Sequence, residues 1–158
     1  MKSSIKLFVA AATVALALIG IGGAAAQDKE TIIKNRETLM KGQGKDVGAV
    51  KAYIDGKGEL AQADAGAAGL AQSTKKIADV FPPGTGGPNS DGKYATKPAI
   101  WTDWSKFLDA QKTAAEKAEV LLVAVKSGDK AKIEAAFGDL GKNGCGACHQ
   151  TFREKLKD

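Results

Sequence analysis

Residues 101–125 read WTDWSKFLDAQKTAAEKAEVLLVAV and contain the clearest helical pattern in the chain. In this stretch positions 101, 104, 108, 111, 115, 118, 122 and 125 follow one another in steps of three and four. Residues at that spacing lie on one face of an α-helix, and most of them here are apolar or small. The stretch therefore predicts a long amphipathic helix. Ser127, Gly128 and Asp129 end it, with Asp129 as the cap of the next helix.

Three other stretches of the sequence also carry apolar residues at helical spacing, which form a stripe along one face of each predicted helix. The first begins at Asp28 and carries Ile33, Met40, Val47 and Ile54, the second carries Ala63, Ala67, Leu70, Thr74, Ile77 and Phe81 up to Pro82, and the last carries Ile133, Phe137, Leu140 and Gly144. Residues 82–98 hold four prolines and four glycines without an apolar period, which predicts a long crossover loop between the second and third helices. The pattern predicts an all-α, antiparallel four-helix bundle. Because the stripes are rich in Ala and Gly, we expect another group to fill the interior.

The beginning of the chain has the features of a cleaved secretory signal peptide. Lys2 and Lys6 flank its start, an apolar run extends over residues 7–21, and residues 24–26 are alanines. The run is shorter than the roughly 20 residues that a membrane anchor needs, so the anchor is the weaker interpretation. We therefore expect residues 1–26 to be removed and residues 27–158 to form one exported domain without a membrane span.

Composition supports one folded domain. The chain has 158 residues, 44% of them hydrophobic, which excludes a disordered protein. Its formal charge is +5, but the cations are scattered among acids rather than gathered in a basic stripe. Nucleic-acid binding is therefore not expected.

The motif that carries chemistry is Cys145-Gly146-Ala147-Cys148-His149, which holds the only two cysteines and the only histidine of the chain. This C-x-x-C-H pattern is the attachment sequence for c-type haem. On a helix its three reactive side chains share a face, so both thiols can form thioethers to the haem vinyl groups while His149 binds the iron. A zinc site would need a fourth ligand, a thioredoxin-like pair would need a βαβ context, and a disulfide here would close only a short loop. We therefore expect one covalently bound haem c inside the bundle.

The second axial position of the iron has one main candidate. Met40 is the only methionine left after signal cleavage, and it lies in the middle of the first stripe. A His/Met pair raises the reduction potential of a cytochrome, whereas a methionine that merely fills the core would leave the iron open. Arg153 follows His149 by four residues and could approach a haem propionate, or it could simply be a solvated arginine. Gly42, Gly44 and Gly48 indicate close approach of the backbone to haem or to a neighbouring helix, or else a frayed or bent helix.

Several segments together resemble the class II c-type cytochromes, the cytochrome c-prime family. They are the C-terminal C-x-x-C-H, Phe81-Pro82-Pro83-Gly84-Thr85, Lys97-Pro98-Ala99-Ile100-Trp101, Phe152-Arg153 and Arg36-Glu37-Thr38-Leu39-Met40. Members with an apolar residue at the last place of the Arg36–Met40 segment are five-coordinate and high-spin, and those with methionine are six-coordinate and low-spin. The resemblance implies Arg36 near a haem propionate and Glu37 at the haem edge. For Glu37 a solvated helix residue is the expected alternative.

These observations predict a periplasmic one-electron carrier rather than an enzyme, with His149 and Met40 as axial ligands. Its partners would be periplasmic or membrane redox proteins that dock at the haem edge, and it would be a monomer or a homodimer. The alternative is a five-coordinate protein that binds nitric oxide or carbon monoxide. A helical scaffold without haem would require the C-x-x-C-H motif to be accidental.

Overall fold

The computed structural model describes residues 28–156. The predicted signal peptide, residues 1–26, lies outside this range. The helices and strands are α1 (Lys29–Ile54), α2 (Leu60–Ser73), η1 (Thr74–Lys76), η2 (Ala78–Val80), β1 (Tyr94–Thr96), α3 (Ala99–Thr102), α4 (Trp104–Ser127), α5 (Lys130–Asp139), η3 (Leu140–Gly146), α6 (Ala147–Phe152) and β2 (Arg153–Lys155).

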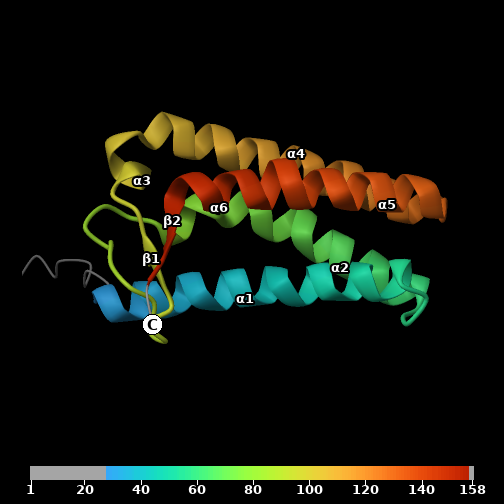
Figure 1. The fold of residues 1–158 in the computed structure, drawn as a ribbon, viewed down its shortest axis with the longest axis horizontal. Helices are drawn as coiled ribbons and strands as arrows, with labels where there is room; N and C mark the ends of the chain where they lie inside the picture. Colours follow the sequence, from blue (N-terminus) through green and yellow to red (C-terminus); the bar gives the residue numbers. More distant parts are fainter. Residues whose placement is uncertain (1–27, 157–158) are drawn as a thin grey trace, which may run out of the picture.

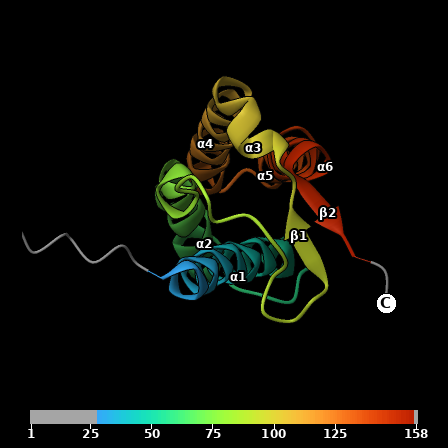
Figure 2. The ribbon, with the colours of Figure 1, turned by 90° about the vertical axis from the view of Figure 1, so that its left-hand side faces the viewer.

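The predicted four-helix bundle is confirmed. Figure 1 shows α1, α2, α4 and the run from α5 to α6 lying side by side, with successive helices running in opposite directions. Seen from one end, the helices surround a common interior, and the crossover from α2 to α3 and α4 passes over that end (Figure 2). The predicted long loop between the second and third helices is therefore also confirmed.

Side-chain caps fix where the helices begin. Asp28 accepts a hydrogen bond from the backbone N–H of Thr31 at 2.9 Å, and Asp129 accepts one from Lys132 at 3.2 Å. Both aspartates satisfy N–H groups that have no partner inside the helix. The expected cap at Asp129 is confirmed.

The prediction of one continuous third helix is wrong, because the helix is interrupted at Asp103. At Asp103 the backbone leaves the helical region, with φ −134° and ψ 56°, so α3 ends at Thr102 and α4 begins at Trp104. The predicted inward face is also wrong at the start of α4, where Trp104 and Leu108 are exposed at 37% and 40% while Phe107 is buried. Similarly, the second stripe ends as the 3₁₀ turns η1 and η2 rather than as α-helix.

The last helix contains a change of winding directly before the C-x-x-C-H motif. Residues Leu140–Gly146 form the π-helix η3, and α6 then continues to Phe152. Two glycines lie at close contacts in this wider winding: a Cβ on Gly146 would lie 2.8 Å from the Gly141 carbonyl oxygen, and one on Gly144 would lie 3.4 Å from the Ala114 Cα of α4. π-Helical turns occur mostly as short insertions in α-helices and often at functional sites.

A small sheet that the sequence did not predict ties the crossover loop to the end of the chain. β1 pairs with β2 in antiparallel fashion, with Ala95 opposite Glu154. The Lys97 backbone N–H donates to the Phe152 carbonyl oxygen at 2.9 Å, and Leu156 N–H donates to Lys93 at 2.9 Å. The loop is therefore fixed to the element that follows the haem motif.

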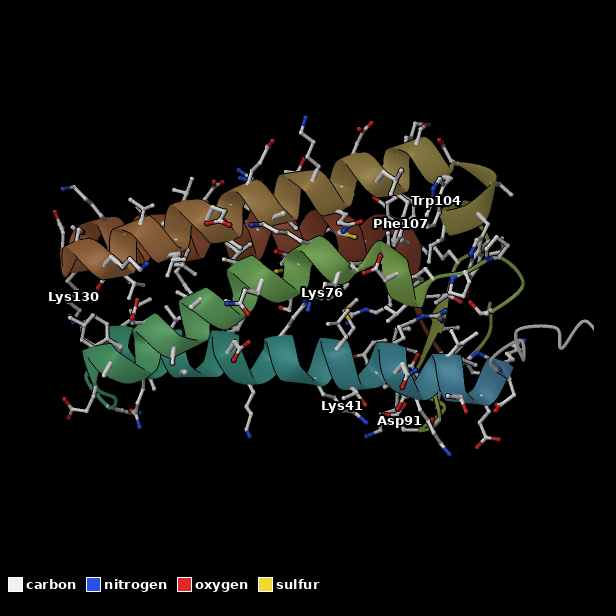
Figure 3. The ribbon with its side chains drawn as sticks, turned by 180° about the vertical axis from the view of Figure 1, so that it is seen from behind. Lys41, Lys76, Asp91, Trp104, Phe107 and Lys130 are labelled. Carbon is white, nitrogen blue, oxygen red and sulfur yellow. The ribbon has the colours of Figure 1, made fainter. Side chains whose placement is uncertain are left out.

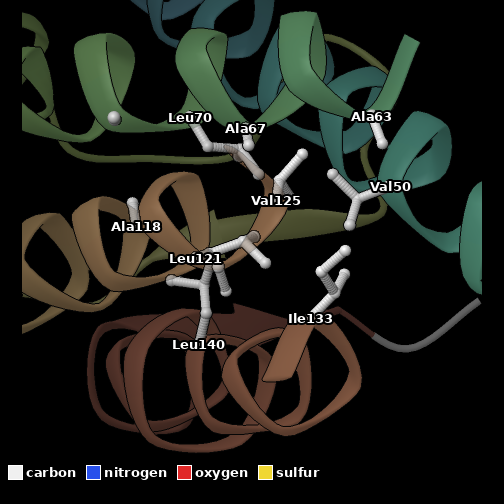
Figure 4. Packing of buried hydrophobic residues seen from close by; sticks show 11 residues of the cluster. Val50, Ala63, Ala67, Leu70, Ala118, Leu121, Val125, Ile133 and Leu140 are labelled. Carbon is white, nitrogen blue, oxygen red and sulfur yellow. The ribbon is translucent and has the colours of Figure 1, made fainter. Parts of the chain in front are cut away.

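The apolar residues form two clusters at different ends of the bundle. The distal core, as we call the first, consists of Val50, Ala63, Ala67, Leu70, Ala71, Ala118, Leu121, Ala124, Val125, Ile133 and Leu140 (Figure 4). The aromatic cluster consists of Ile77, Phe81, Ile100, Phe107 and Phe152. Within it the Phe107 ring lies 5.0 Å from the Phe81 ring and 5.2 Å from the Phe152 ring, between centroids.

The close contacts between α1 and α2 come from glycines of α2 rather than from those of α1. A Cβ on Gly66 would lie 2.7 Å from the backbone oxygen of Asp46, whereas one on Gly42 or Gly48 would meet no atom within 4 Å. The expectation that Gly42 and Gly48 mark close approach to a neighbouring helix is therefore wrong, and α1 continues through them without a break.

No helix within residues 28–156 combines the length and the apolar character that a membrane span requires.

Candidate functional site

A cavity of about 360 Å³ lies between α1, the end of α2, α4 and α6. All seven residues that the sequence singled out line it: Arg36, Glu37, Met40, Cys145, Cys148, His149 and Arg153. Its size falls in the range of pockets that bind small molecules and cofactors. The interior space expected from the small residues of the stripes is therefore present, beside the predicted site residues.

The C-x-x-C-H motif supplies one wall of this cavity. Cys145 lies at the end of η3, and Cys148 and His149 lie one turn later in α6, so all three side chains face the same space. Burial raises the pKa of Cys145, and burial together with the nearby Cys145 sulfur raises the pKa of Cys148 to about 11. Both groups are therefore thiols at neutral pH, and neither is paired in a disulfide.

His149 is held in its neutral form. Burial lowers the pKa of its imidazole, and the positive charge of Arg153 lowers it further. A neutral imidazole is the form that binds a metal, because a ring nitrogen then keeps its lone pair. The geometry and the charge distribution therefore both suit His149 as an iron ligand.

Met40 faces the cavity from α1. It packs against the aromatic cluster, as do its neighbour Leu39 and the motif residue Cys148. The adjacent Lys41 instead extends outside the bundle, as Figure 3 shows, while Phe107 of α4 lies on the inner side. The Met40 thioether and the His149 imidazole therefore border the same space from two different helices.

Arg36 is a buried cation beside the cavity, with only 4% of its surface exposed. Its Nε donates to the Val80 carbonyl oxygen at 3.1 Å, and its Nη1 and Nη2 donate to the carbonyl and hydroxyl oxygens of Thr85 at 3.2 and 2.8 Å. Its guanidinium also lies 4.2 Å from the centroid of the Phe81 ring. Burial lowers the pKa of Arg36 to about 10, so it stays charged at neutral pH.

Arg36 has no ion pair with a carboxylate of residues 28–156, although buried charges are normally paired. Its hydrogen bonds instead hold the start of the crossover loop against α1. A negatively charged group in the cavity would compensate this cation, which fits the propionate contact that the family resemblance implies.

Glu37 is not the solvated residue that we considered the more plausible alternative. Only 10% of its side chain is exposed, and it accepts a hydrogen bond from the Ser90 backbone N–H at 2.5 Å. This bond, together with Lys41 at 3.3 Å, holds the pKa of Glu37 below its usual value. The burial was not predictable from α1 alone, because the covering residue comes from the crossover loop.

Arg153 is exposed and belongs to β2. Its guanidinium lies 4.4 Å from the centroid of the Tyr94 ring of β1, and both residues line the cavity. The arginine therefore borders the cavity at the sheet while the rest of its surface faces solvent.

Sequence reasoning missed several residues of the site. Thr85, Tyr94 and Phe107 complete the walls or hold them in place, and Gln43 lies one turn after Met40. The step of three residues from Met40 to Gln43 is a signal that was available. The positions of Thr85 and Tyr94 depend on the path of the crossover loop, which no local pattern encodes.

The residues present fit a haem c group. Two thiols and an imidazole lie along one wall, apolar and aromatic side chains form much of the rest, and Arg36 is an uncompensated cation. This donor set suits a flat apolar ring with acidic substituents and a central iron. Within residues 28–156, no three His, Cys, Asp or Glu side chains gather closely enough to hold a metal ion by themselves.

Comparison with known proteins decides the family. The family model described as Cytochrome C' matches residues 31–153. The chain belongs to the cytochrome c' family. The predicted resemblance is thereby confirmed, and so is the cofactor, because proteins of this family bind one covalently attached haem c with its iron.

Individual relatives agree with the family match. Cytochrome c-556 of Agrobacterium tumefaciens is 35% identical over 125 residues, which cover 78% of this chain and 97% of the relative. A solved cytochrome c' with an unusual ligand-controlled dimer dissociation superposes with a TM-score of 0.75 at 26% identity, covering 83% of this chain and all of the other. A nitric oxide complex of a cytochrome c prime variant from Alcaligenes xylosoxidans superposes with a TM-score of 0.70 at 28% identity, covering 81% and 97%.

Proposed function

We propose that the protein is a periplasmic mono-haem cytochrome that binds small gaseous ligands, nitric oxide or carbon monoxide, at its iron. The observation that carries the proposal is that the chain's only two cysteines and its only histidine line one and the same cavity. When bound, the haem c group supplies an iron that can exchange one electron. This iron can also bind a ligand in addition to the protein's histidine.

In this proposal Cys145 and Cys148 hold the haem and His149 binds its iron. Each thiol would add its S–H across one haem vinyl group, a reaction that needs no oxidant and has no leaving group. The neutral imidazole of His149 lies one residue after the second thiol. Arg36, Glu37 and Arg153 would border the edge of the ring, where Arg36 can neutralise a propionate.

Gas binding is favoured over the electron carrier that the sequence alone suggested first. A structurally similar variant of a family member forms a complex with nitric oxide, and the relatives described above carry no mention of a His/Met ligand pair. The cavity of this chain is enclosed mostly by apolar side chains such as Ile77, Phe81 and Ile100. Such walls suit a small neutral ligand.

One-electron transfer with Met40 as the second axial ligand remains the other candidate, because Met40 lines the same cavity as His149. Bound sulfur would leave no open position and would raise the reduction potential. Redox partners that dock at the haem edge would then take the place of a gaseous ligand.

Optical and electron-resonance spectra of the natural protein and of Met40→Leu separate the two candidates. A gas-binding site predicts a high-spin ferric spectrum and ready carbon monoxide binding in both proteins, since leucine keeps a similar apolar volume. A low-spin spectrum with the weak near-infrared band of His/Met ligation, lost in Met40→Leu together with a fall in potential, would establish the electron carrier instead. Val47→Leu changes another cavity residue and is the matched control.

Haem attachment is tested by denaturing the protein in acidified organic solvent. Haem bound through Cys145 and Cys148 stays with the polypeptide, and the double variant Cys145→Ala with Cys148→Ala should yield little holoprotein. Haem recovered entirely in the solvent from the natural protein would exclude the proposed thioethers.

Export is tested by intact mass. The proposed domain boundaries require periplasmic protein with the mass of residues 27–158 plus one haem. Uncleaved protein in the membrane fraction would instead show that residues 1–26 act as an anchor.

Association is tested by light scattering with and without carbon monoxide. A similar solved cytochrome c' has a ligand-controlled dimer dissociation, which supports the homodimer among the two predicted states. A single mass equal to one chain at all concentrations, with and without the ligand, would establish the monomer.

A further inference from the structure

Lys97 of the crossover loop makes two hydrogen bonds to the last turn of α6. Its backbone N–H donates to the Phe152 carbonyl oxygen at 2.9 Å, and its Nζ donates to the Gln150 carbonyl oxygen at 2.9 Å. The last four carbonyls of a helix have no partner within that helix. One residue from a distant part of the chain therefore satisfies two of the four carbonyls at the end of α6.

The turn that Lys97 holds also carries His149. This residue lies three positions before the end of α6, and its carbonyl oxygen accepts from the Arg153 backbone N–H at the helix end. α6 has only six residues and follows the π-helix η3. Because helix ends fray, a change in this last turn would move the backbone of His149 as well.

The imidazole of His149 lacks the acidic partner that often fixes such a ring. A histidine that binds a metal usually donates its other ring N–H to a carboxylate, a carbonyl or a water, and this bond sets the ring orientation. Within residues 28–156 no carboxylate forms an ion pair with His149. The charge that acts on the ring is that of Arg153, which cannot accept a hydrogen bond. The ring orientation therefore depends strongly on the backbone of α6.

Lys97 is itself held by the elements on both sides of it. Its carbonyl oxygen accepts from the Ile100 backbone N–H at 3.2 Å, and Ile100 is buried in the aromatic cluster. The preceding residue, Thr96, pairs with Arg153 in the small sheet. Figure 2 shows β1, α3 and α6 meeting at one end of the bundle. Lys97 therefore connects α6 to a part of the fold that is fixed independently.

We propose that Lys97 is a positioning residue for His149. By holding the last turn of α6, it keeps the imidazole in one orientation toward the cavity. Lys97 does not line the cavity, so it acts through the α6 backbone. A cation at the C-terminal end of a helix is also favoured by the helix dipole. This inference rests on the proposed binding of the haem iron by His149.

The test measures the iron–histidine stretching band of the reduced holoprotein by resonance Raman spectroscopy. Lys97→Met keeps a long side chain without a donor, whereas Lys97→Arg keeps both the donor and the charge. The band should broaden and shift in Lys97→Met and stay close to the natural position in Lys97→Arg. Hydrogen exchange at the Arg153 amide should become about 2- to 10-fold faster in Lys97→Met, the equivalent of one net hydrogen bond.

The matched control is Lys93→Met, which removes an exposed lysine from the same loop and should leave the band unchanged. All spectra are repeated with Met40→Leu present, because a bound thioether would hide the band. A band that Lys97→Met leaves unchanged would overturn the positioning role, as would an equal shift in Lys93→Met, which would report charge alone. Absence of the band from attached haem, with and without Met40→Leu, would overturn iron binding by His149 and this inference with it.

Discussion

At the scale of single residues, the cavity rim is held by charges that contact the crossover loop. Arg36 gives three hydrogen bonds to Val80 and Thr85, and Glu37 accepts one from Ser90. Adjacent residues of α1 therefore fix two separate points of one loop. The same two side chains line the cavity, so loop position and the binding site are coupled.

Arg36→Lys should lower the free energy of unfolding by about 2 kcal/mol, because one ammonium cannot reach all three acceptors and hydrogen bonds to charged groups each contribute about 1.5–3 kcal/mol. Because lysine keeps the positive charge, the loss of stability measures the missing hydrogen-bond geometry of the guanidinium rather than a change in electrostatics. Urea unfolding of the holoprotein measures it. Lys34→Gln, which removes an exposed partner of Glu30, is the control and should change stability by less than about 1 kcal/mol. An equal effect of the two substitutions would contradict the role of Arg36.

The Glu37 contact should disappear in acid. The Ser90 N–H, with help from Lys41, keeps the pKa of Glu37 below 4.5 in the folded protein. A depressed carboxyl pKa stabilises the fold above the unfolded-state value and loses that effect as the pH falls through the folded-state value. The natural protein should therefore be more stable than Glu37→Gln at pH 7, and the difference should close below about pH 4. A difference that is constant from pH 7 to pH 3 would show that the carboxylate charge has no part in it.

At the scale of helices, α1 and α2 approach closely only where α2 carries glycine. A Cβ on Gly66 would lie 2.7 Å from the Asp46 backbone oxygen and 3.2 Å from the Ala49 Cβ. Burial raises the pKa of the Asp46 carboxyl beside this contact. The Asp46 carboxylate also borders Gly69, where a Cβ would collide with it. The two helices therefore cannot accept a larger residue here without separating.

Gly66→Ala should cost about 1–3 kcal/mol, the usual penalty of overpacking a buried contact. Gly48→Ala is the opposite case, because the new methyl group meets nothing and alanine is the better helix former by about 0.5–1 kcal/mol. Thermal unfolding of both variants measures the contrast. Equal shifts in the same direction would mean that the glycines act through helix propensity alone.

Periodicity predicted the helices but not their irregularities. The stripes located the four long helices, and the starts at Asp28 and Asp129 were predicted, because each helix must turn an apolar face inward. The break at Asp103 and the π-helix over Leu140–Gly146 were missed, since apolar positions continue on both sides of each. In the same way, the motif predicted Cys145, Cys148 and His149 on one face, yet it contains no signal for the π-helix that precedes Cys148 and His149.

At the scale of the whole molecule, the features that the sequence did not predict depend on contacts between segments that lie far apart in the chain. The β1–β2 pairing joins Tyr94 to Lys155, and backbone hydrogen bonds of this kind carry no side-chain pattern. The covering of Glu37 by Ser90 has the same origin. The cofactor was predictable from the five residues of the C-x-x-C-H motif, and the family was predictable from that motif together with the other segments that resemble it.

The molecule divides into a distal core and an aromatic cluster, and only the residues of the latter line the cavity themselves. At about 24 cal/mol per Å³, a dry cavity of about 360 Å³ would cost about 9 kcal/mol, which is close to the whole stability of a typical domain. Without haem, the cavity end must therefore take up water or collapse, while the distal core keeps its packing.

Hydrogen exchange of the Cys145→Ala, Cys148→Ala protein should show this division. Backbone amides at Val50, Leu121 and Ile133 in the distal core should stay protected, because their contacts do not involve the cavity. Amides at Phe81, Ile100 and Phe107 should exchange faster than in the holoprotein, since the cofactor stabilises only the part of the fold that it contacts. The holoprotein carrying Lys34→Gln serves as a control for a substitution away from both clusters. Protection lost equally at both ends would show that the bundle unfolds as one unit, and protection retained at both ends would show that the aromatic cluster packs without haem.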